Sequence, residues 1–331
     1  MNKVMVIGSN SFSGQDFVDL LLDETDCRVI GVSRSPEKPP VFCRYRLRDS
    51  GDSGDFTYHQ LDLNDDAEAI GELLERERPD VIVNFAAQSE VAPSWDNPWH
   101  WYQTNVVALS KLTQRLIGKD WLDTYVHISS PEVYGTTEGI VHEDGLIDPS
   151  TPYAASKAAA DLHLSTLEKN FDFPLAWIRA TNVYGPGQQL FKIIPRSFIR
   201  IRQGETIQLH GGGVAVKSYI HIRDVSRAEL AVAAGGRRGG WHVSPDEGVE
   251  VREVVGRICD AAGVSFDTAV EAVEERLGQD RAYVISSERA RADLGWKPEV
   301  SLEEGISQTG AWIDENWAEI ERLPHDYQHQ K

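Results

Sequence analysis

Short apolar runs alternate with segments of helical spacing through the first 180 residues. The apolar runs predict buried strands at residues 3–7, 28–32, 56–61, 80–85, 124–128 and 173–179. Between them, apolar positions that recur every three or four residues predict helices at 17–22, 66–77, 105–117 and 153–169. Strands that alternate with helices build a parallel sheet covered on both faces. The pattern therefore predicts an α/β fold of the doubly wound, Rossmann type.

The pattern changes after the sixth predicted strand, where Thr181-Asn182-Val183-Tyr184-Gly185-Pro186-Gly187 interrupts it. Amphipathic helices follow at 249–262 and 302–316. We assign 1–180, with about 217–236, to a dinucleotide-binding domain, and 181–216 with 237–331 to a smaller α/β lobe for the substrate. Residues 35–55 and 276–281 are expected to be loops, and 323–331 a frayed end.

Charge and cysteine content narrow the class of protein. The 331 residues hold 33 Lys and Arg against 52 Asp and Glu, so the net charge of −19 argues against nucleic acid or an anionic membrane as partner. The start of the chain runs directly into a strand, and no apolar run is long enough to span a bilayer. Cys27, Cys43 and Cys259 show no metal-ligand spacing and predict reduced thiols in a cytoplasmic protein without a metal site.

A glycine-containing turn connects the first predicted strand to the first helix, in the order Gly8-Ser9-Asn10-Ser11-Phe12-Ser13-Gly14. Such a turn lets backbone amides and the helix N-terminus meet a pyrophosphate. We expect a dinucleotide to contact Gly8, Asn10, Ser11, Phe12 and Gly14. The alternative is an ordinary strand-to-helix turn. Ser11 stands where a middle glycine is usual and would add a side chain beside the pyrophosphate.

The ends of the next strands bear on the choice of cofactor. The second strand ends at Ser33-Arg34, where an acid would hold a ribose 2′-hydroxyl and an Arg would accommodate a 2′-phosphate. The absence of an acid favours NADP over NAD, unless Arg34 is a solvated loop charge. Asp62, before Leu63, could contact adenine or cap the following helix. Ala86-Ala87-Gln88 offers small side chains that a cofactor could approach.

The chemistry is expected between residues 127 and 157. Tyr153 and Lys157 lie one helical turn apart, so a Lys ammonium there would favour phenolate and lower the pKa of Tyr153. Such a Tyr can take a proton from a sugar hydroxyl. Ser130, just past a strand, could hold that hydroxyl, and Glu132 adds a carboxylate.

Other side chains have two interpretations each. Trp95, Trp99, Trp101 and Tyr102 could line a sugar pocket, although core or dimer packing is the commoner role. An acidic protein also needs positively charged side chains around a bound diphosphate. Four Lys and Arg residues could have this role, or they could be ordinary surface charges. The candidates are Lys192, Arg196, Lys217 and Arg223.

The whole chain resembles an extended short-chain dehydrogenase/reductase of the nucleotide-sugar epimerase/dehydratase class. The resemblance rests on Gly8…Gly14, Asp62-Leu63, Ala86-Ala87-Gln88-Ser89, Ser130…Gly135, Tyr153…Lys157, Asn182…Gly187 and Arg276…Asp280. Within this class, the glutamate at position 132 resembles the pattern of the 4,6-dehydratases that act on dTDP-glucose or GDP-mannose. Gln88-Ser89 and Arg34 lean towards the GDP-mannose type, which uses NADP.

The resemblance implies an NDP-hexose 4,6-dehydratase with tightly bound, recycled NAD(P). Oxidation at C4 would precede loss of water between C5 and C6, and reduction at C6 would follow. Tyr153 would take the O4 proton, Glu132 the C5 proton, Lys157 would hold the ribose and Ser130 would orient O4. Asn105 would join the cofactor site, and helices 98–117 and 153–169 would form a homodimeric four-helix bundle. The substrate would meet Gln88, Ser94, Ser130, Glu132, Asn182, Lys192, Lys217 and Arg276.

Pro131 departs from the family pattern, which has Asp or Ser there. Pro has no side-chain proton to give to the leaving C6 hydroxyl, so Glu132 would carry both proton steps. Three alternatives stay open: an NDP-sugar 4-epimerase, a UDP-glucuronate decarboxylase, and a non-catalytic nucleotide-binding member.

Overall fold

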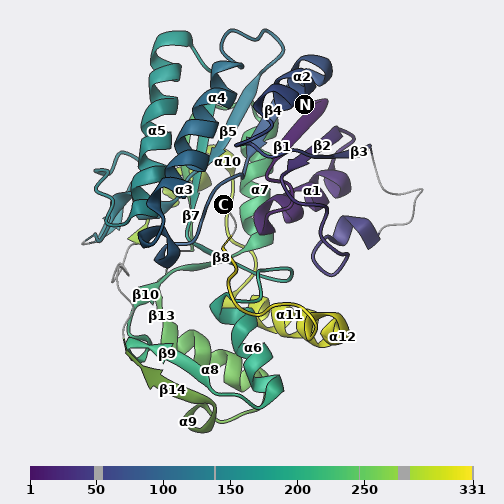
Figure 1. Ribbon diagram of the computed structural model, residues 1–331. Helices are drawn as coiled ribbons and strands as arrows, with labels where there is room; N and C mark the ends of the chain where they lie inside the picture. The colour runs from purple at the N-terminus through teal and green to yellow at the C-terminus, as the bar shows by residue number, and fades with distance from the viewer. Residues whose placement is uncertain (48–54, 138, 246, 275–283, 330–331) are drawn as a thin grey trace.

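A seven-stranded parallel sheet forms the centre of the protein (Figure 1). The computed structural model describes residues 1–47, 55–137, 139–245, 247–274 and 284–329. The strand order is β12-β7-β5-β4-β1-β2-β3, so the direction of winding reverses between β1 and β4. This doubly wound order confirms the predicted fold class. The strands are β1 (Lys3–Ile7), β2 (Arg28–Ser33), β3 (Phe56–Gln60), β4 (Val81–Asn84), β5 (Thr124–Ile128), β7 (Leu175–Ala180) and β12 (Gly239–Val243).

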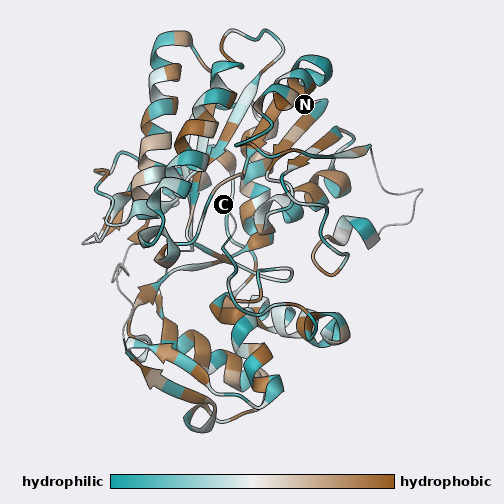
Figure 2. Cartoon of the chain, in the orientation of Figure 1, coloured by the Kyte–Doolittle hydropathy of each residue, from teal (hydrophilic) through white to brown (hydrophobic). Residues whose placement is uncertain are grey.

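Alternate residues of each strand enter two separate cores, one on each face of the sheet. Val4 and Val6 of β1 pack with α1 (Phe12–Glu24) and α7 (Ile222–Ala234). Met5 and Ile7 of the same strand pack on the other face, with α2 (Ala67–Glu77), α4 (Leu109–Gln114) and α5 (Pro152–Phe171). Because both faces are covered, central strands such as β1 and β4 are mostly apolar, and β1 is largely brown in Figure 2.

The single helix predicted at 105–117 is divided in the structure. The chain forms α3 (Pro98–Tyr102), a π-helical turn η3 (Gln103–Ala108) and then α4. Asn105 lies in the π-helical turn, and its side chain bonds both backbone groups of Gln88, at 2.8 Å to the N–H and 3.0 Å to the carbonyl. Turns of this kind are frequent at functional sites.

The smaller lobe is built around a helical core. α6 (Ile193–Gln203), α8 (Val251–Ala261) and α11 (Leu302–Glu315) pack together through apolar residues such as Ile194, Ile258 and Ile313. Three short strand pairs accompany this core: β8 (Asn182–Tyr184) with β11 (Tyr219–His221), β9 (Ile207–His210) with β14 (Val270–Val273), and β10 (Val216–Lys217) with β13 (Val249–Glu250). A fourth pair, β6 (Ile140–Val141) with β15 (Val284–Ile285), packs in a separate cluster with Val133 and Ala158. The remaining short helices are η1 (Arg44–Leu47), η2 (Ala92–Trp95), η4 (Pro131–Tyr134), η5 (Gly211–Gly213), α9 (Phe266–Ala269), α10 (Glu288–Leu294) and α12 (Trp317–Ile320).

The assignment of cofactor binding to one region and of substrate binding to the other stays a prediction. β12, which the sequence division placed in the smaller lobe, pairs in parallel with β7 and is an edge strand of the main sheet. We therefore propose a division in which Gly239–Val243 belongs to the dinucleotide-binding region. The loop predicted at 276–281 lies outside the described residues.

The expectation of a frayed C-terminus is wrong for residues 323–329. Tyr327 packs edge-on against Phe191, with ring centroids 5.2 Å apart. His329 stacks on Trp101 at 5.2 Å with nearly parallel rings. Aromatic contacts at two points order this segment, and Figure 1 shows the C-terminus over the dinucleotide-binding region rather than beside α12.

The structure also allows a search for membrane-spanning helices, metal-binding clusters and disulfide bonds. Within the described part of the chain, every helix is too short or too polar to cross a bilayer. Over the same residues, no cluster of three His, Cys, Asp or Glu side chains is arranged to hold a metal ion. Cys27, Cys43 and Cys259 are buried and free.

Candidate active site

Two glycines of the first turn are required by close packing. Gly8 has a φ of 82°, and a Cβ added to it would lie 2.6 Å from the backbone N of Ala86. A Cβ on Gly14 would lie 2.3 Å from the carbonyl oxygen of Gly8. Between them, Ser11 caps α1 by accepting a 3.0 Å hydrogen bond from the Gly14 N–H. The serine that replaces the expected middle glycine therefore stabilises the start of the helix.

A cavity of about 500 Å³ opens at the carboxyl ends of β1 to β4. This is the switch point of the sheet, where doubly wound folds bind dinucleotides, and the volume is typical of a ligand site. The expected cofactor residues that line it are Gly8, Asn10, Ser11, Arg34, Asp62, Leu63, Ala86, Ala87 and Gln88. These expected cofactor residues thus lie around one cavity, whose size fits the adenosine half of a dinucleotide.

Three other expected cofactor residues lie elsewhere. Phe12 lines a second cavity, and Gly14 packs beneath the turn against Gly8. Asn105 lines neither cavity and acts on the backbone of Gln88 instead. Gln88 lines the first cavity and not the second, and its expected roles in cofactor and substrate binding both stay predictions.

The second cavity, of about 320 Å³, contains the expected catalytic residues. Ser130, Glu132, Tyr153 and Lys157 all line it. It adjoins the first cavity through a shared wall of Ser11, Phe85, Ala87, Ser89 and Gln189. A dinucleotide whose adenosine half occupies the first cavity would therefore reach the catalytic residues with its nicotinamide half.

Helix caps place the reactive side chains. Ser130 begins η4 and accepts a hydrogen bond from the Glu132 N–H at 3.3 Å. Thr151 caps α5 by accepting from the Ala154 N–H at 3.1 Å. The Tyr153 N–H, which has no partner within the helix at this position, donates to Ser94 Oγ at 3.2 Å. Ser94 lines neither cavity, and its contact with the backbone of Tyr153 positions the start of α5; its expected contact with the substrate stays a prediction.

The expectation that Lys157 lowers the pKa of Tyr153 is wrong for this structure. Burial raises the pKa of the Tyr153 phenol, and the negative charge of Glu132 raises it further, while a hydrogen bond with Ser130 lowers it. Burial also lowers the pKa of Lys157 to about 8, against the attraction of Asp161. Desolvation is the largest effect on both groups and disfavours the charged form of each.

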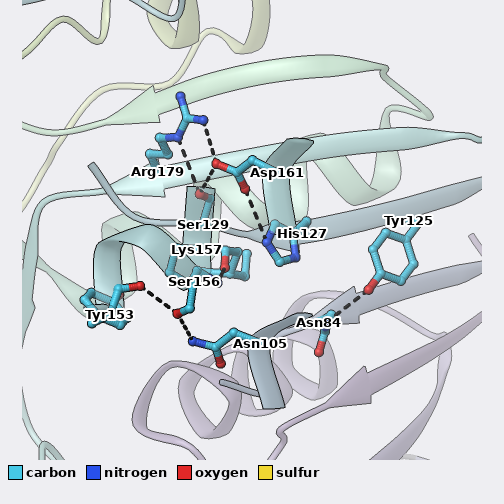
Figure 3. Close-up of polar contacts among 11 residues, drawn as sticks. Asn84, Asn105, Tyr125, His127, Ser129, Tyr153, Ser156, Lys157, Asp161 and Arg179 are labelled. Carbon is cyan, nitrogen blue, oxygen red and sulfur yellow. Dashed lines mark hydrogen bonds and ion pairs between the residues drawn. The ribbon is translucent and has the colours of Figure 1, made fainter. Parts of the chain in front are cut away.

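A buried polar network behind Lys157 escaped the sequence analysis (Figure 3). Lys157 Nζ donates a 2.6 Å hydrogen bond to the Ile128 carbonyl at the end of β5. Asp161, one turn further along α5, accepts hydrogen bonds of 2.7 Å from both Arg179 and Ser129. Its spacing of four residues from Lys157 was the available signal.

His127 completes this network. Its Nε2 lies 3.4 Å from Asp161 Oδ1. Burial lowers the pKa of His127 to about 4, so the imidazole is neutral at pH 7. Burial tends to raise the pKa of Asp161, but the hydrogen bond from His127 and the charge of Arg179 hold it well below the usual range. Asp161 is therefore an anion between Lys157 and Arg179.

The remaining expected residues separate into two groups. Asn182 and Lys192 line the catalytic cavity; Asn182 donates to the Ser218 carbonyl at 3.0 Å, and Lys192 pairs with Glu90 at 2.7 Å. Lys217 lies in β10 and lines neither cavity. Arg223 pairs with Asp16 and Asp19 of α1, which corrects its expected place beside a diphosphate. Arg276 lies outside the described residues.

Comparisons with known proteins identify the family of this chain. The family model described as GDP-mannose 4,6 dehydratase matches residues 5–309. The chain is 34% identical over 306 residues to the low-salt glycan biosynthesis protein Agl12 of Haloferax volcanii, covering 92% of this chain and 96% of the relative. It is 31% identical to dTDP-glucose 4,6-dehydratase of Xanthomonas campestris, over 81% of this chain and 82% of that one.

Solved structures show the same fold. DesIV, a dTDP-glucose 4,6-dehydratase from Streptomyces venezuelae with NAD and TYD bound, matches with a TM-score of 0.86 and 30% identity, over 96% of this chain and 98% of its own. MoeE5 in complex with UDP-glucose and NAD matches with a TM-score of 0.84 and 25% identity, over 96% and 100% of the two chains. With the site's geometry and the family match over most of its length, the chain is an enzyme that belongs to the GDP-mannose 4,6 dehydratase family.

Proposed function

We propose that this protein is an NDP-hexose 4,6-dehydratase, which forms an NDP-4-keto-6-deoxyhexose. The observation that carries the proposal is the meeting of Ser130, Glu132, Tyr153 and Lys157 in one cavity that adjoins the dinucleotide cavity. These side chains supply a proton acceptor, a hydroxyl that orients it, a cation and a carboxylate. That set is what a cycle of oxidation, elimination and reduction on one sugar requires.

Tyr153 is proposed as the base at the sugar O4. Ser130, which bonds the Tyr153 hydroxyl, orients the same oxygen. A bound nicotinamide cofactor would accept hydride from C4 and return it to C6. Its oxidised ring is cationic, so it would oppose the effects of burial and Glu132, which hold Tyr153 protonated in the structure. Lys157, fixed on the Ile128 carbonyl, would hold the ribose.

Glu132 is proposed to remove the C5 proton and to deliver it to the leaving C6 oxygen. Its neighbour Pro131 is buried at the first turn of η4 and has no proton to give. Proline suits this position because its φ is already helical and its missing N–H is not needed there. The loop geometry is therefore kept while the usual acid is lost, which leaves Glu132 as the carboxyl group of this loop.

The cofactor is proposed to be NADP. The end of β2 offers Ser33 and Arg34 to the cavity, and Lys38 lines the same side. A 2′-phosphate would find cations there, whereas the acid that grips a free 2′-hydroxyl is absent at Ser33 and Arg34. The related structures hold NAD, so the preference requires a direct comparison of the two cofactors.

We also propose a cytoplasmic homodimer that forms through α3, α4 and α5. Large apolar side chains are exposed on α3, on α5 and on the π-helical turn next to α4, with Trp99 59% and Leu162 58% exposed. Tyr102 and Val107 extend the same surface at 40% each. Exposed apolar patches of this kind mark protein interfaces. The protein's mass in solution, compared with that of Leu162→Glu, tests the dimer.

Product identification tests the reaction and names the nucleotide. The enzyme is incubated in deuterated water with dTDP-, UDP-, GDP- and CDP-hexoses, without added cofactor, and products are analysed by mass spectrometry. Loss of water with one deuterium gained supports the proposal. An isomer of unchanged mass would instead establish an epimerase, and loss of carbon dioxide from a uronate a decarboxylase. Absence of any turnover across the panel, with cofactor bound, would favour a non-catalytic member.

A further inference from the structure

The last described residues form one wall of the dinucleotide cavity. After α12 the chain turns back, and Leu323, Pro324, Asp326, Tyr327 and Gln328 line the cavity together with the turn at Gly8 and the end of β2. This segment begins in the smaller lobe and ends over the dinucleotide-binding region (Figure 1). It is defined here as the strap, residues 323–329.

Burial alternates along the strap. Leu323, His325, Tyr327 and His329 are half-buried, and the residues between them are exposed. The half-buried side chains are a large apolar residue and three rings, which make the packing contacts of the segment. Pro324, Asp326 and Gln328 line the cavity and stay exposed.

Each end of the strap is fixed to a different part of the protein. In the smaller lobe, His325 Nε2 lies 2.9 Å from the Ile320 carbonyl, and Tyr327 packs on Phe191. In the dinucleotide-binding region, His329 stacks on Trp101, which is fully buried, and its Nε2 lies 2.8 Å from His100 Nδ1. The Tyr327 hydroxyl, 3.0 Å from His329 Nδ1, links the two attachments.

The strap encloses the cavity without filling it. About 500 Å³ remains between the strap and the glycine turn, which is ample for the adenosine half of a dinucleotide. None of the strap residues lines the catalytic cavity. We therefore expect the strap to affect binding of the cofactor and not the reaction of the sugar.

We propose that residues 323–329 close the adenosine side of the cofactor site and hold the dinucleotide between turnovers. The inference rests on the proposed cycle, in which the same cofactor is oxidised and reduced on each substrate and its loss would interrupt turnover. Because Tyr327 holds the strap on Phe191 and His329 holds it on Trp101 and His100, release of the cofactor requires both contacts to open. Tyr327, in the middle, is the residue whose loss weakens them most.

The test is the dissociation rate of NADPH from the full-length protein, from a chain that ends at Arg322, and from Tyr327→Ala. Bound NADPH is displaced by excess NADP and followed by its fluorescence. Phe171→Ala, which removes an exposed aromatic ring at the far end of α5, is the matched control. We expect dissociation at least about tenfold faster in both strap variants and unchanged in the control. Turnover of the strap variants should depend on added cofactor and recover when it is saturating.

Two outcomes would overturn the proposal. An unchanged dissociation rate in the shortened chain and in Tyr327→Ala would show that the strap is only packed beside the site. Slower dissociation would show that the strap competes with the cofactor. Tyr327→Phe keeps the ring against Phe191 and loses only the bond to His329, so it separates the two contacts if the shortened chain fails to fold. These are binding measurements, so they hold whichever reaction the product analysis identifies.

Discussion

Lys157 Nζ donates a 2.6 Å hydrogen bond to the Ile128 carbonyl, which joins helix α5 to the carboxyl end of strand β5. The bond fixes the ammonium in the wall of the catalytic cavity, one turn from Tyr153. Asp161 lies one turn further along the same helix and supplies the negative charge that opposes the desolvation of Lys157. The position of Tyr153, the proposed base, thus depends on a helix register that the end of β5 holds in place.

Removal of the Tyr153 hydroxyl should abolish turnover and leave the cofactor bound. In Tyr153→Phe the ring still fills its place, but the base at O4 is lost, and turnover should fall by at least about a hundredfold. Tyr102→Phe, which alters an exposed tyrosine outside both cavities, is the control. Product formation and bound cofactor are measured on the same samples. Turnover of Tyr153→Phe at the parent rate would exclude Tyr153 as the base.

Glu132→Gln should separate the first chemical step from the second. The amide keeps the size of the side chain but cannot take the C5 proton, so C4 oxidation should proceed and elimination should stop. We expect reduced cofactor to accumulate, seen by its absorbance, with no loss of water from the sugar. Product made at the parent rate would mean that Glu132 has only a structural role.

Asp161→Asn should destabilise the protein although the residue contacts no substrate in the proposed site. It would leave the buried Arg179 guanidinium without its anion, a change that costs about 3–5 kcal/mol in comparable buried pairs. Chemical denaturation measures the free energy of unfolding. Glu253→Gln, which breaks an exposed pair with Arg257, should cost less than about 0.5 kcal/mol. Equal losses in the two variants would contradict the role assigned to burial.

Ser33→Asp combined with Arg34→Ala should reverse the cofactor preference. An Asp at the end of β2 can accept the 2′-hydroxyl of NAD and repels a 2′-phosphate, while loss of Arg34 removes the cation. The dissociation constant for NADPH should rise at least about tenfold relative to that for NADH. Arg257→Ala, far from the cavity, controls for loss of one positive charge. A parent protein that binds NADH more tightly than NADPH would refute the NADP proposal.

Glu229→Gln should stabilise the protein at alkaline pH. Glu229 is fully buried in α7 and neither carboxyl oxygen has a hydrogen-bond partner among the described residues. Burial raises its pKa well above 4.5, and Asp16 raises it further. Between 4.5 and that higher value the unfolded chain is ionised and the folded one is not, so stability falls as pH rises.

The glutamine variant lacks this proton linkage. Its advantage in melting temperature over the parent should therefore be larger at pH 8 than at pH 5. Asp314→Asn, which alters an exposed carboxylate on α11, should show no such dependence on pH. An advantage that is the same at both pH values would mean that Glu229 is ionised in the folded state.

The sequence by itself determined the sheet and the principal site residues, for a local physical reason. Apolar runs such as 3–7 and 124–128 are buried on both faces, and their pattern is readable without knowledge of partners. Gly14 is required by the nearby carbonyl of Gly8, a contact within the same turn. Tyr153 and Lys157 lie on one helix, so their separation follows from the helical repeat.

The tertiary structure decided what depends on contacts between distant segments. The pKa of Tyr153 follows from burial and from Glu132, and its expected lowering by Lys157 failed because desolvation depends on the whole surrounding fold. Arg179 comes from β7 to neutralise Asp161 on α5. The strap departs furthest from expectation: a polar, aromatic end reads as frayed until Phe191 and Trp101, far away in sequence, provide the surfaces on which Tyr327 and His329 pack.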